Sequence, residues 1–304
     1  MKFTIIGAPT SAGSHNAGQE DAPAALRAAG LVDQLRAAGM DVEDAGDLPR
    51  SPYRPQGIGV PARDLDRVAG VLTRLAGQVA GIARTGRVPI VLGGDCTITL
   101  GAVAGLQAAA PDRLGLLYFD GDIDLSRPDE PSSGVLDSMV VSHLLGRGAG
   151  ALTHLGPRTP ALDETELALF GYHPVEASAE HREWLHHSRV SHRPVTEIRE
   201  DAPGAAAGLV RELAERVDRI LVHVDVDVID SGDFPLGNFP HFNGGLTADE
   251  AFACLAEFTA VDALAGLVVT EVNPHHDPDG TMVARLSAAI AGALARRAAV
   301  AASS

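Results

Sequence analysis

The sequence has few cysteines, few aromatic residues and no long apolar run. Its two cysteines, Cys96 and Cys254, lie far apart and outside any Cys-x-x-Cys pair, so they form no disulfide framework and favour a reducing compartment. No run approaches the roughly 20 apolar residues that cross a bilayer, and the first residues lack the apolar core of a signal peptide. We therefore expect a cytoplasmic protein without a membrane partner.

Basic residues are also scarce. The 304 residues include 24 Lys and Arg against 40 Asp and Glu, which gives a formal net charge of −16 at pH 7. This balance argues against nucleic acid or an anionic membrane surface as the main partner. By contrast, 45% of the residues are hydrophobic, which is enough for a large core and excludes a disordered chain.

Apolar β-branched runs alternate with Ala-, Leu- and Arg-rich stretches of helical spacing. This alternation is typical of repeated βα units and predicts an α/β fold with a mainly parallel sheet flanked by helices. The expected strands are Phe3–Ile6, Val88–Leu92, Leu114–Phe119, Ala151–Leu155, Ile220–Val224 and Leu264–Thr270, with weaker ones near Met40–Val42 and Ser188–His192. The expected helices are Ala22–Ala38, Leu65–Arg84, Thr97–Ala109, Val135–Leu145, Ala161–Leu169, Pro203–Arg216, Ala248–Ala260 and Thr281–Val300. No change in composition marks a linker, so we expect one domain over residues 1–304.

Acidic residues follow four of the expected strands. They are Asp95, then Asp120, Asp122 and Asp124, then Asp225, Asp227 and Asp230, and finally Glu271. The carboxyl ends of parallel strands meet at one edge of a sheet, and alternate residues of an extended segment face the same way. Carboxylates gathered in a partly dry crevice need a cation, so the pattern predicts a divalent metal site.

Two cysteines and two of these acids have alternative interpretations. A thiolate from Cys96 would favour zinc or another late transition metal over magnesium or calcium, although an isolated cysteine is more often a small buried side chain. Cys254 has the spacing of a helix core position. Asp95 and Asp230 can instead cap a helix or close a turn.

Several motifs carry a family resemblance, and they occur in order along nearly the whole chain. The motifs are GGDCTITLG, YFDGDIDL, SSGVLDSM, HVDVDVID, GGLT and EVNP. They resemble the motifs of the ureohydrolase family, the arginases and agmatinases. The resemblance implies a single three-layer α/β/α domain, a homo-oligomer (trimer or hexamer), and a centre of two manganese ions whose bridging hydroxide attacks a guanidinium carbon and releases urea.

The resemblance also assigns roles to individual residues. The implied metal ligands are Cys96, Asp120, Asp122, Asp124, Asp225 and Asp227, with Asp120 and Asp225 bridging. Glu271 matches the carboxylate that pairs with the substrate guanidinium. A carboxylate can accept two parallel hydrogen bonds from the planar guanidinium group. Ser133 and Thr247 match further polar contacts. From the mechanism itself, and not from the resemblance, we expect Asp124 or Asp227 to take or relay the proton.

The chain departs from the family at several positions. Cys96 and Asp122 stand where the family has histidine ligands. The ligands of this chain, five Asp and one thiolate, therefore carry a total charge of −6, whereas the family's four Asp and two neutral histidines carry −4. Zinc, iron or a single manganese ion therefore remain open beside two manganese ions. Asp137 replaces the histidine of the substrate loop, and Ser126 replaces an asparagine.

These departures bear on the substrate and on proton transfer. Asp137 would repel an α-carboxylate and favour a cation, whereas Arg127 would restore carboxylate binding. His143, His223 and His241 are expected near the same edge. His241 is the candidate replacement for a lost proton shuttle, although a structural or surface position is the more common one for a histidine.

We expect a metal-dependent hydrolase of a small-molecule guanidino or amidino compound, with Glu271 binding the cationic group and a metal-bound hydroxide attacking it. Two alternatives stay open. One is a catalytically inactive arginase-fold protein with a binding or regulatory role. The other is a related metal-dependent deacylase or amide hydrolase, which would have little use for Glu271.

Overall fold

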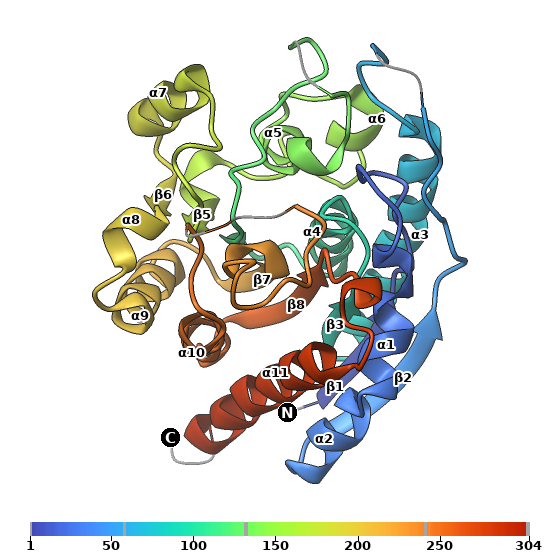
Figure 1. Cartoon of the computed structure of the whole chain (residues 1–304), viewed down its shortest axis with the longest axis vertical. Coiled ribbons are helices and arrows are strands. Elements are labelled where there is room, and N and C mark those ends of the chain that lie inside the picture. Colours follow the sequence, from blue (N-terminus) through green and yellow to red (C-terminus); the bar gives the residue numbers. More distant parts are fainter. Residues whose placement is uncertain (1, 57–58, 131–132, 240–241, 243, 302–304) are drawn as a thin grey trace.

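One parallel sheet organises the chain. The structure, a computed structural model, describes residues 2–56, 59–130, 133–239, 242 and 244–301 (Figure 1). In these residues eight strands pair in the order β2-β1-β3-β8-β7-β4-β5-β6, and every pair is parallel. The strands are β1 Lys2–Gly7, β2 Asp41–Asp47, β3 Val88–Leu92, β4 Leu114–Phe119, β5 Leu167–Phe170, β6 Ser191–Arg193, β7 Arg219–Asp225 and β8 Leu264–Thr270. The parallel sheet expected from the βα alternation is confirmed.

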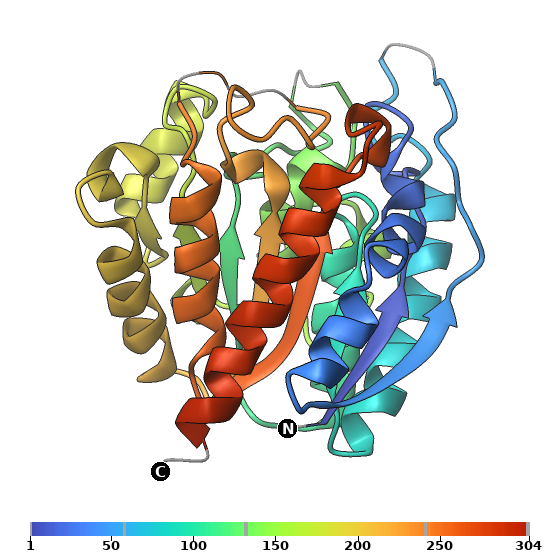
Figure 2. The ribbon, with the colours of Figure 1, turned by 60° about the horizontal axis from the view of Figure 1, so that its bottom comes forward.

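Helices cover both faces of this sheet, which gives three layers (Figure 2). One buried apolar cluster lies under α1 Ala22–Ala28, α2 Leu31–Ala37, α8 Val195–Ile198, α9 Ala202–Ala214, α10 Ala248–Thr259 and α11 Thr281–Ala301. A second cluster lies under α3 Leu65–Arg84, α4 Ile98–Ala109, α5 Val140–Leu144, α6 Gly150–Thr153 and α7 Ala179–His187. The three-layer α/β/α fold is therefore confirmed.

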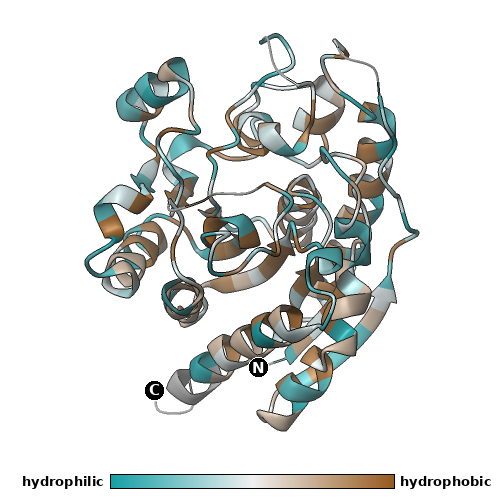
Figure 3. Cartoon of the chain, viewed as in Figure 1, coloured by the Kyte–Doolittle hydropathy of each residue, from teal (hydrophilic) through white to brown (hydrophobic). Residues whose placement is uncertain are grey.

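The residue pattern of each element explains its place. In β4 every residue is buried, and alternation sends Leu116 and Tyr118 to one cluster and Leu117 to the other. In α3 the buried residues Leu72 and Leu75 recur at helical spacing, so one side of the helix packs inward. Figure 3 shows the result as mixed hydropathy along α3 and α11 and apolar colouring along β8.

Four expected elements differ from the structure. The strand expected at Ala151–Leu155 is wrong, because this segment contains the short helix α6. The helix expected at Ala161–Leu169 is also wrong: Asp163 and Glu166 form a capping box around a single 3-10 turn, and strand β5 follows. Gly30, at φ 85°, divides the expected first helix into α1 and α2, and a 3-10 turn at Asp137–Met139 shortens the one expected at Val135–Leu145.

The strands deliver their carboxyl ends to a common edge, where long loops gather (Figure 2). β3, β8, β7 and β4 are consecutive at the centre of the sheet, and the acidic residues follow these four strands. None of the helices in the described part of the chain has the length and apolar character that crossing a membrane requires. The sheet edge therefore sets the position of the candidate site.

Candidate metal centre and active site

The loop after β3 brings Cys96 into the site. Gly94 has a φ of 154°, and a Cβ there would lie 2.6 Å from the carbonyl oxygen of Ala8, so only glycine fits without a shift. The carboxylate of Asp95 accepts hydrogen bonds from the backbone N–H of Gly13 (2.9 Å) and of Thr97 (3.2 Å). Asp95 therefore fixes the loop, which confirms its interpretation as a turn residue.

The loop after β4 supplies three carboxylates. The backbone N–H of Asp122 donates to Oδ1 of Asp120 at 2.7 Å, and the hydroxyl of Tyr118 donates to Oδ2 of Asp124. Asp124 has a φ of 45°, which is uncommon for a residue with a side chain and is held here by the surrounding contacts. All three carboxylates face one pocket, as the alternating motif predicts.

The end of β7 supplies two more carboxylates. The N–H of Asp227 donates to Oδ1 of Asp225 at 2.8 Å, and Oδ1 of Asp227 accepts the N–H of Gly121 at 3.1 Å. This second bond ties the loop after β7 to the loop after β4. The two acidic motifs, about a hundred residues apart, thus form one wall of the pocket.

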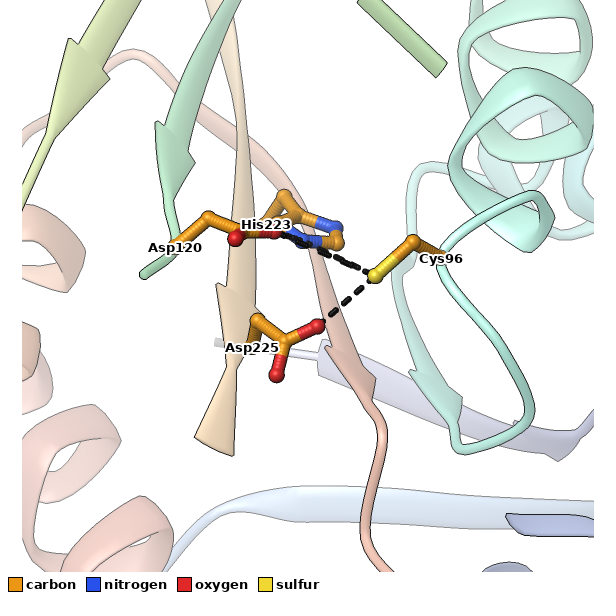
Figure 4. A group of neighbouring side chains, drawn as sticks. All are labelled: Cys96, Asp120, His223 and Asp225. Atoms are coloured by element: carbon orange, nitrogen blue, oxygen red, sulfur yellow. Dashed lines mark hydrogen bonds and ion pairs between the residues drawn. The ribbon is translucent and has the colours of Figure 1, made fainter. Parts of the chain in front are cut away.

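Cys96 and three neighbours form a compact cluster of possible metal ligands (Figure 4). The other members are Asp120, His223 and Asp225, and one donor atom from each lies within 4.8 Å of all the others. The Cys96 Sγ lies 2.7 Å from Oδ2 of Asp225 and 3.9 Å from both Oδ2 of Asp120 and Nε2 of His223. His223 Nε2 lies 3.3 Å from Oδ2 of Asp120.

The sequence predicted His223 near this edge, but not its place among the possible metal ligands. A signal for it exists in the sequence, because His223 stands two residues before Asp225 on β7 and alternation turns both side chains to one side. Its pairing with Tyr118 on β4 could not be foreseen. The two residues are register partners, and their rings stack at 4.0 Å.

Glu271 closes the other side of the pocket. It follows β8 with a φ of 58°, and its N–H donates to the carbonyl oxygen of Gly94 at 3.0 Å. Its Oε2 accepts a hydrogen bond from Nε2 of Gln19 at 2.7 Å, whereas its Oε1 is buried and has no hydrogen-bond partner among the described residues. A carboxylate with one unpaired buried oxygen is prepared to bind a donor.

The pocket brings most of the predicted site residues together. It is lined by Ser14, His15, Cys96, Asp120, Asp122, Asp124, Asp137, Ser138, Asp225, Asp227, Asn238, Phe239 and Glu271. Of these, Ser14, His15, Ser138, Asn238 and Phe239 were not singled out from the sequence, because they come from loops without a motif of their own. Their contribution depends on how the loops fold over the sheet edge.

Other candidates lie outside that lining. Thr247 caps α10, where its Oγ1 accepts the N–H of Glu250, and Ser133 accepts the N–H of Val135. Ser126 lies in the loop after β4, where its N–H donates to the carbonyl oxygen of Ser138. His241 lies outside the described residues. The substrate and proton roles expected for these four residues stay predictions.

The other residues considered from the sequence have structural roles in the fold. Both ring nitrogens of the buried His143 are hydrogen-bonded to backbone, so it has a structural position. Asp230 closes a turn by accepting backbone N–H bonds, including that of Gly232. Arg127 pairs with Glu130 at 2.9 Å and with Asp129 at 3.2 Å. Cys254 is a buried residue of α10, as its helical spacing predicts.

Ionising all of these buried acids at once is unfavourable when no cation is bound. Burial, with the nearby charge of Asp227, raises the pKa of Asp120 and of Asp225 well above the usual range. Burial and the charge of Asp225 likewise raise the pKa of the Cys96 thiol. Burial lowers the pKa of His223 to about 3, so its imidazole is neutral near neutral pH. A bound cation would stabilise the charged forms of these acids, and the oxygen, sulfur and nitrogen donors fit a divalent metal.

Comparisons with known proteins agree with the fold and the motifs. Arginase from Bacillus caldovelox is 28% identical over 298 residues, covering 96% of this chain and 97% of that protein. Arginase-1 from Homo sapiens is 30% identical over 277 residues, covering 89% of this chain and 84% of that protein. The solved structure of the Bacillus caldovelox arginase matches with a TM-score of 0.85 at 27% identity, covering 96% and 97% of the two chains. The model of the arginase family matches residues 1–296, and this chain belongs to that family.

Proposed function

We propose that this protein is a metal-dependent hydrolase that cleaves a C–N bond in a cationic guanidino or amidino compound and releases urea or its equivalent. The main support for this proposal is the burial and the incomplete hydrogen bonding of the Glu271 carboxylate. It is only 6% exposed, it faces the acidic pocket, and its Oε1 has no hydrogen-bond partner among the described residues. A guanidinium group offers the charge and the paired N–H donors that such a carboxylate accepts.

The neighbouring residues prepare Glu271 for this role. Gln19 occupies Oε2 through a hydrogen bond of 2.7 Å, and the backbone bond to Gly94 fixes the position of the residue. Burial and the charge of Asp137 raise the pKa of Glu271. A cationic substrate would favour the ionised carboxylate, so substrate binding would displace the proton that burial retains.

The acidic residues of the pocket would hold the metal and handle the proton. A divalent metal in this pocket would lower the pKa of a water molecule and polarise the substrate carbon. In the hydrolysis, the water oxygen bonds to the guanidinium carbon and the C–N bond to the leaving nitrogen breaks. That nitrogen takes up the two protons that the water loses and departs as an ammonium group. We assign the proton relay to Asp124 or Asp227, whose carboxylates lie in the same pocket.

The charge of the pocket favours a substrate without a carboxylate near its guanidinium. Asp137 lines the pocket, and the lining residues include no arginine or lysine in the described part of the chain. Arg127, which would attract a substrate carboxylate, is paired with Glu130 and Asp129 instead. We therefore propose a cationic guanidino or amidino compound with a neutral or cationic tail.

Urea release from purified, metal-loaded protein tests the function. We expect urea from a guanidino compound with a cationic or neutral tail, and slower release from one that carries a carboxylate. Glu271→Gln keeps the shape of the side chain but removes its charge, and we expect it to lower kcat/KM at least about 100-fold, as loss of a charge-assisted pair at a buried site implies. Activity unchanged in this variant would overturn the role of Glu271.

Glu43→Gln is the matched control, because Glu43 lies on the exposed edge strand β2 and its side chain is 65% exposed. This variant should keep full activity. No turnover with any guanidino or amidino compound, in protein that holds its metal, would support the non-catalytic alternative. The retained Glu271 and the shared pocket of six Asp carboxylates do not favour that alternative.

A further inference from the structure

We propose that Cys96, Asp120, His223 and Asp225 bind one zinc ion. His223 begins the HVDVDVID motif, but it is not among the metal ligands that the family resemblance implies. The four side chains come from three different segments, the loop after β3, the end of β4 and strand β7, and all four are buried. In Figure 4 the thiol, the imidazole and the two carboxylates point toward one another. The proposal rests on the proposed function only in requiring a divalent metal.

The separations of the donor atoms suit a single tetrahedral ion. Zinc bonds of about 2.0–2.1 Å to nitrogen and oxygen and about 2.3 Å to sulfur place neighbouring tetrahedral ligands about 3.3–3.6 Å apart. Nε2 of His223 lies 3.3 Å from Oδ2 of Asp120, and Sγ of Cys96 lies 3.9 Å from both atoms. The contact from Cys96 to Asp225, at 2.7 Å, must lengthen when the thiol proton is replaced by a metal, and the two separations of 3.9 Å from the sulfur must shorten slightly.

The surroundings of His223 orient its imidazole for metal binding. Its Nδ1 lies 2.7 Å from Oγ1 of Thr99 on α4, and its ring stacks on Tyr118 with an interplanar angle of 8°. When Nδ1–H donates to Thr99, Nε2 presents a lone pair to the cluster. A partner on the second nitrogen is the usual way in which a metal-bound histidine is held.

The other buried histidine of this region offers a contrast. In His143, Nδ1 contacts the carbonyl oxygen of Met139 at 2.7 Å, and Nε2 accepts the N–H of Ala149 at 3.1 Å. Both nitrogens of His143 are therefore used by the backbone. The Nε2 of His223 contacts the carboxylate of Asp120, the thiol of Cys96 and the hydroxyl of Thr270.

The chemistry of the four donors selects zinc. A thiolate and an imidazole are ligands that zinc binds well, whereas manganese and magnesium prefer carboxylate and water oxygens. The thiolate and two carboxylates carry three negative charges, which a divalent ion reduces to one. Asp122, Asp124 and Asp227 lie in the same pocket but outside this four-residue group.

Metal binding to the 304-residue chain tests the proposal without reference to activity. After metal removal, zinc titration against a competing chelator should show one tightly bound zinc ion per chain. X-ray absorption should show one sulfur at about 2.3 Å and nitrogen or oxygen ligands at about 2.0–2.1 Å. Cobalt-loaded protein should show a thiolate-to-cobalt charge-transfer band in the near ultraviolet.

Three variants identify the ligands. Cys96→Ser should abolish the charge-transfer band, and His223→Asn should weaken zinc binding by more than about 100-fold and remove the imidazole signal from the X-ray absorption spectrum. Thr99→Val should weaken binding by about 10–100-fold, as expected for loss of a partner that orients a ligand. Cys254→Ser and His143→Asn are the matched controls, since both residues are buried away from the cluster, and they should retain the cobalt spectrum.

The outcomes separate this inference from the proposed function. An unchanged affinity and spectrum in His223→Asn would overturn the assignment of His223. Urea release by protein that holds two manganese ions, together with the absence of a thiolate band from its cobalt-loaded form, would overturn the zinc site and leave the proposed function standing. One zinc ion bound with the expected spectrum, in protein that releases no urea, would support the zinc site and contradict the proposed function.

Discussion

Cys96, Asp225 and His223 differ in how they must change to bind a metal. A metal ligand binds in its deprotonated form, so Cys96 and Asp225 must lose any proton that burial retains. The pKa of each is raised, first by burial and then by neighbouring carboxylates, so the protonated form persists to higher pH than in water. His223, with a pKa of about 3, is already neutral and has no proton to release.

Zinc binding should therefore release protons and become tighter as the pH rises. The sign follows from the raised pKa values of Cys96, Asp120 and Asp225, because protons compete with the metal below those values. Calorimetric titration with zinc near neutral pH, in two buffers of different ionisation enthalpy, should show release of at least one proton. Cys96→Ser should release one proton fewer than the parent protein, and a heat of binding that is the same in both buffers would contradict the prediction.

At the scale of elements, the strand ends and their loops place the site residues. β7 turns His223 and Asp225 to one side because they are two residues apart, and β4 lies beside it in register. β3 contributes through the Gly93-Gly94 turn, which lets Cys96 approach. Gly94 also accepts the backbone bond of Glu271, so a single turn supports both the metal cluster and the proposed substrate carboxylate.

Gly94→Ala should destabilise the protein by about 2–4 kcal/mol, because the left-handed φ and the close approach to Ala8 each carry a cost. Urea denaturation measures the loss. Gly77→Ala is the matched control: Gly77 lies inside α3 with open space around its Cα, and alanine there should stabilise by about 0.5–1 kcal/mol. Equal effects of the two substitutions would show that the turn after β3 is not constrained as described.

At the scale of the whole molecule, the order of the strands decides which loops meet. β3, β8, β7 and β4 are adjacent at the centre of the sheet, although β8 comes last in the sequence. Their carboxyl ends bring together acidic residues from four distant segments. Repulsion among these carboxylates therefore destabilises the folded chain, and a bound cation reduces that repulsion.

Removal of zinc should therefore lower the thermal stability of the protein. Zinc at 1,000 times its dissociation constant contributes about 4.1 kcal/mol to the folded state. In a large domain, a loss of 1 kcal/mol lowers the Tm by about 2 °C, so removal of zinc should lower the Tm by about 8 °C. Calorimetry with and without chelator measures the shift, and a Cys96→Ser, His223→Asn double variant should show almost none. An equal shift in that variant would place the stabilising metal elsewhere.

The sequence predicted most of the sheet because its central strands are short apolar runs between turn residues, as in Val88–Leu92 and Leu114–Phe119. It failed at Leu167–Phe170, where the capping signal of Asp163 and Glu166 resembles the start of a helix but ends after one turn. Local signals identify an element, yet its length and pairing depend on the neighbouring strand. β5 forms because β4 offers a partner for its four buried residues.

By itself, the sequence determined the α/β class, the family motifs and the set of carboxylates at the strand ends, because these depend on local patterns and spacing. The tertiary structure alone decided that His223 joins Cys96 and that Gln19 occupies one oxygen of Glu271. These contacts join residues more than a hundred positions apart. They depend on strand order and register, which no local pattern specifies, because pairing is chosen by the packing of the complete sheet.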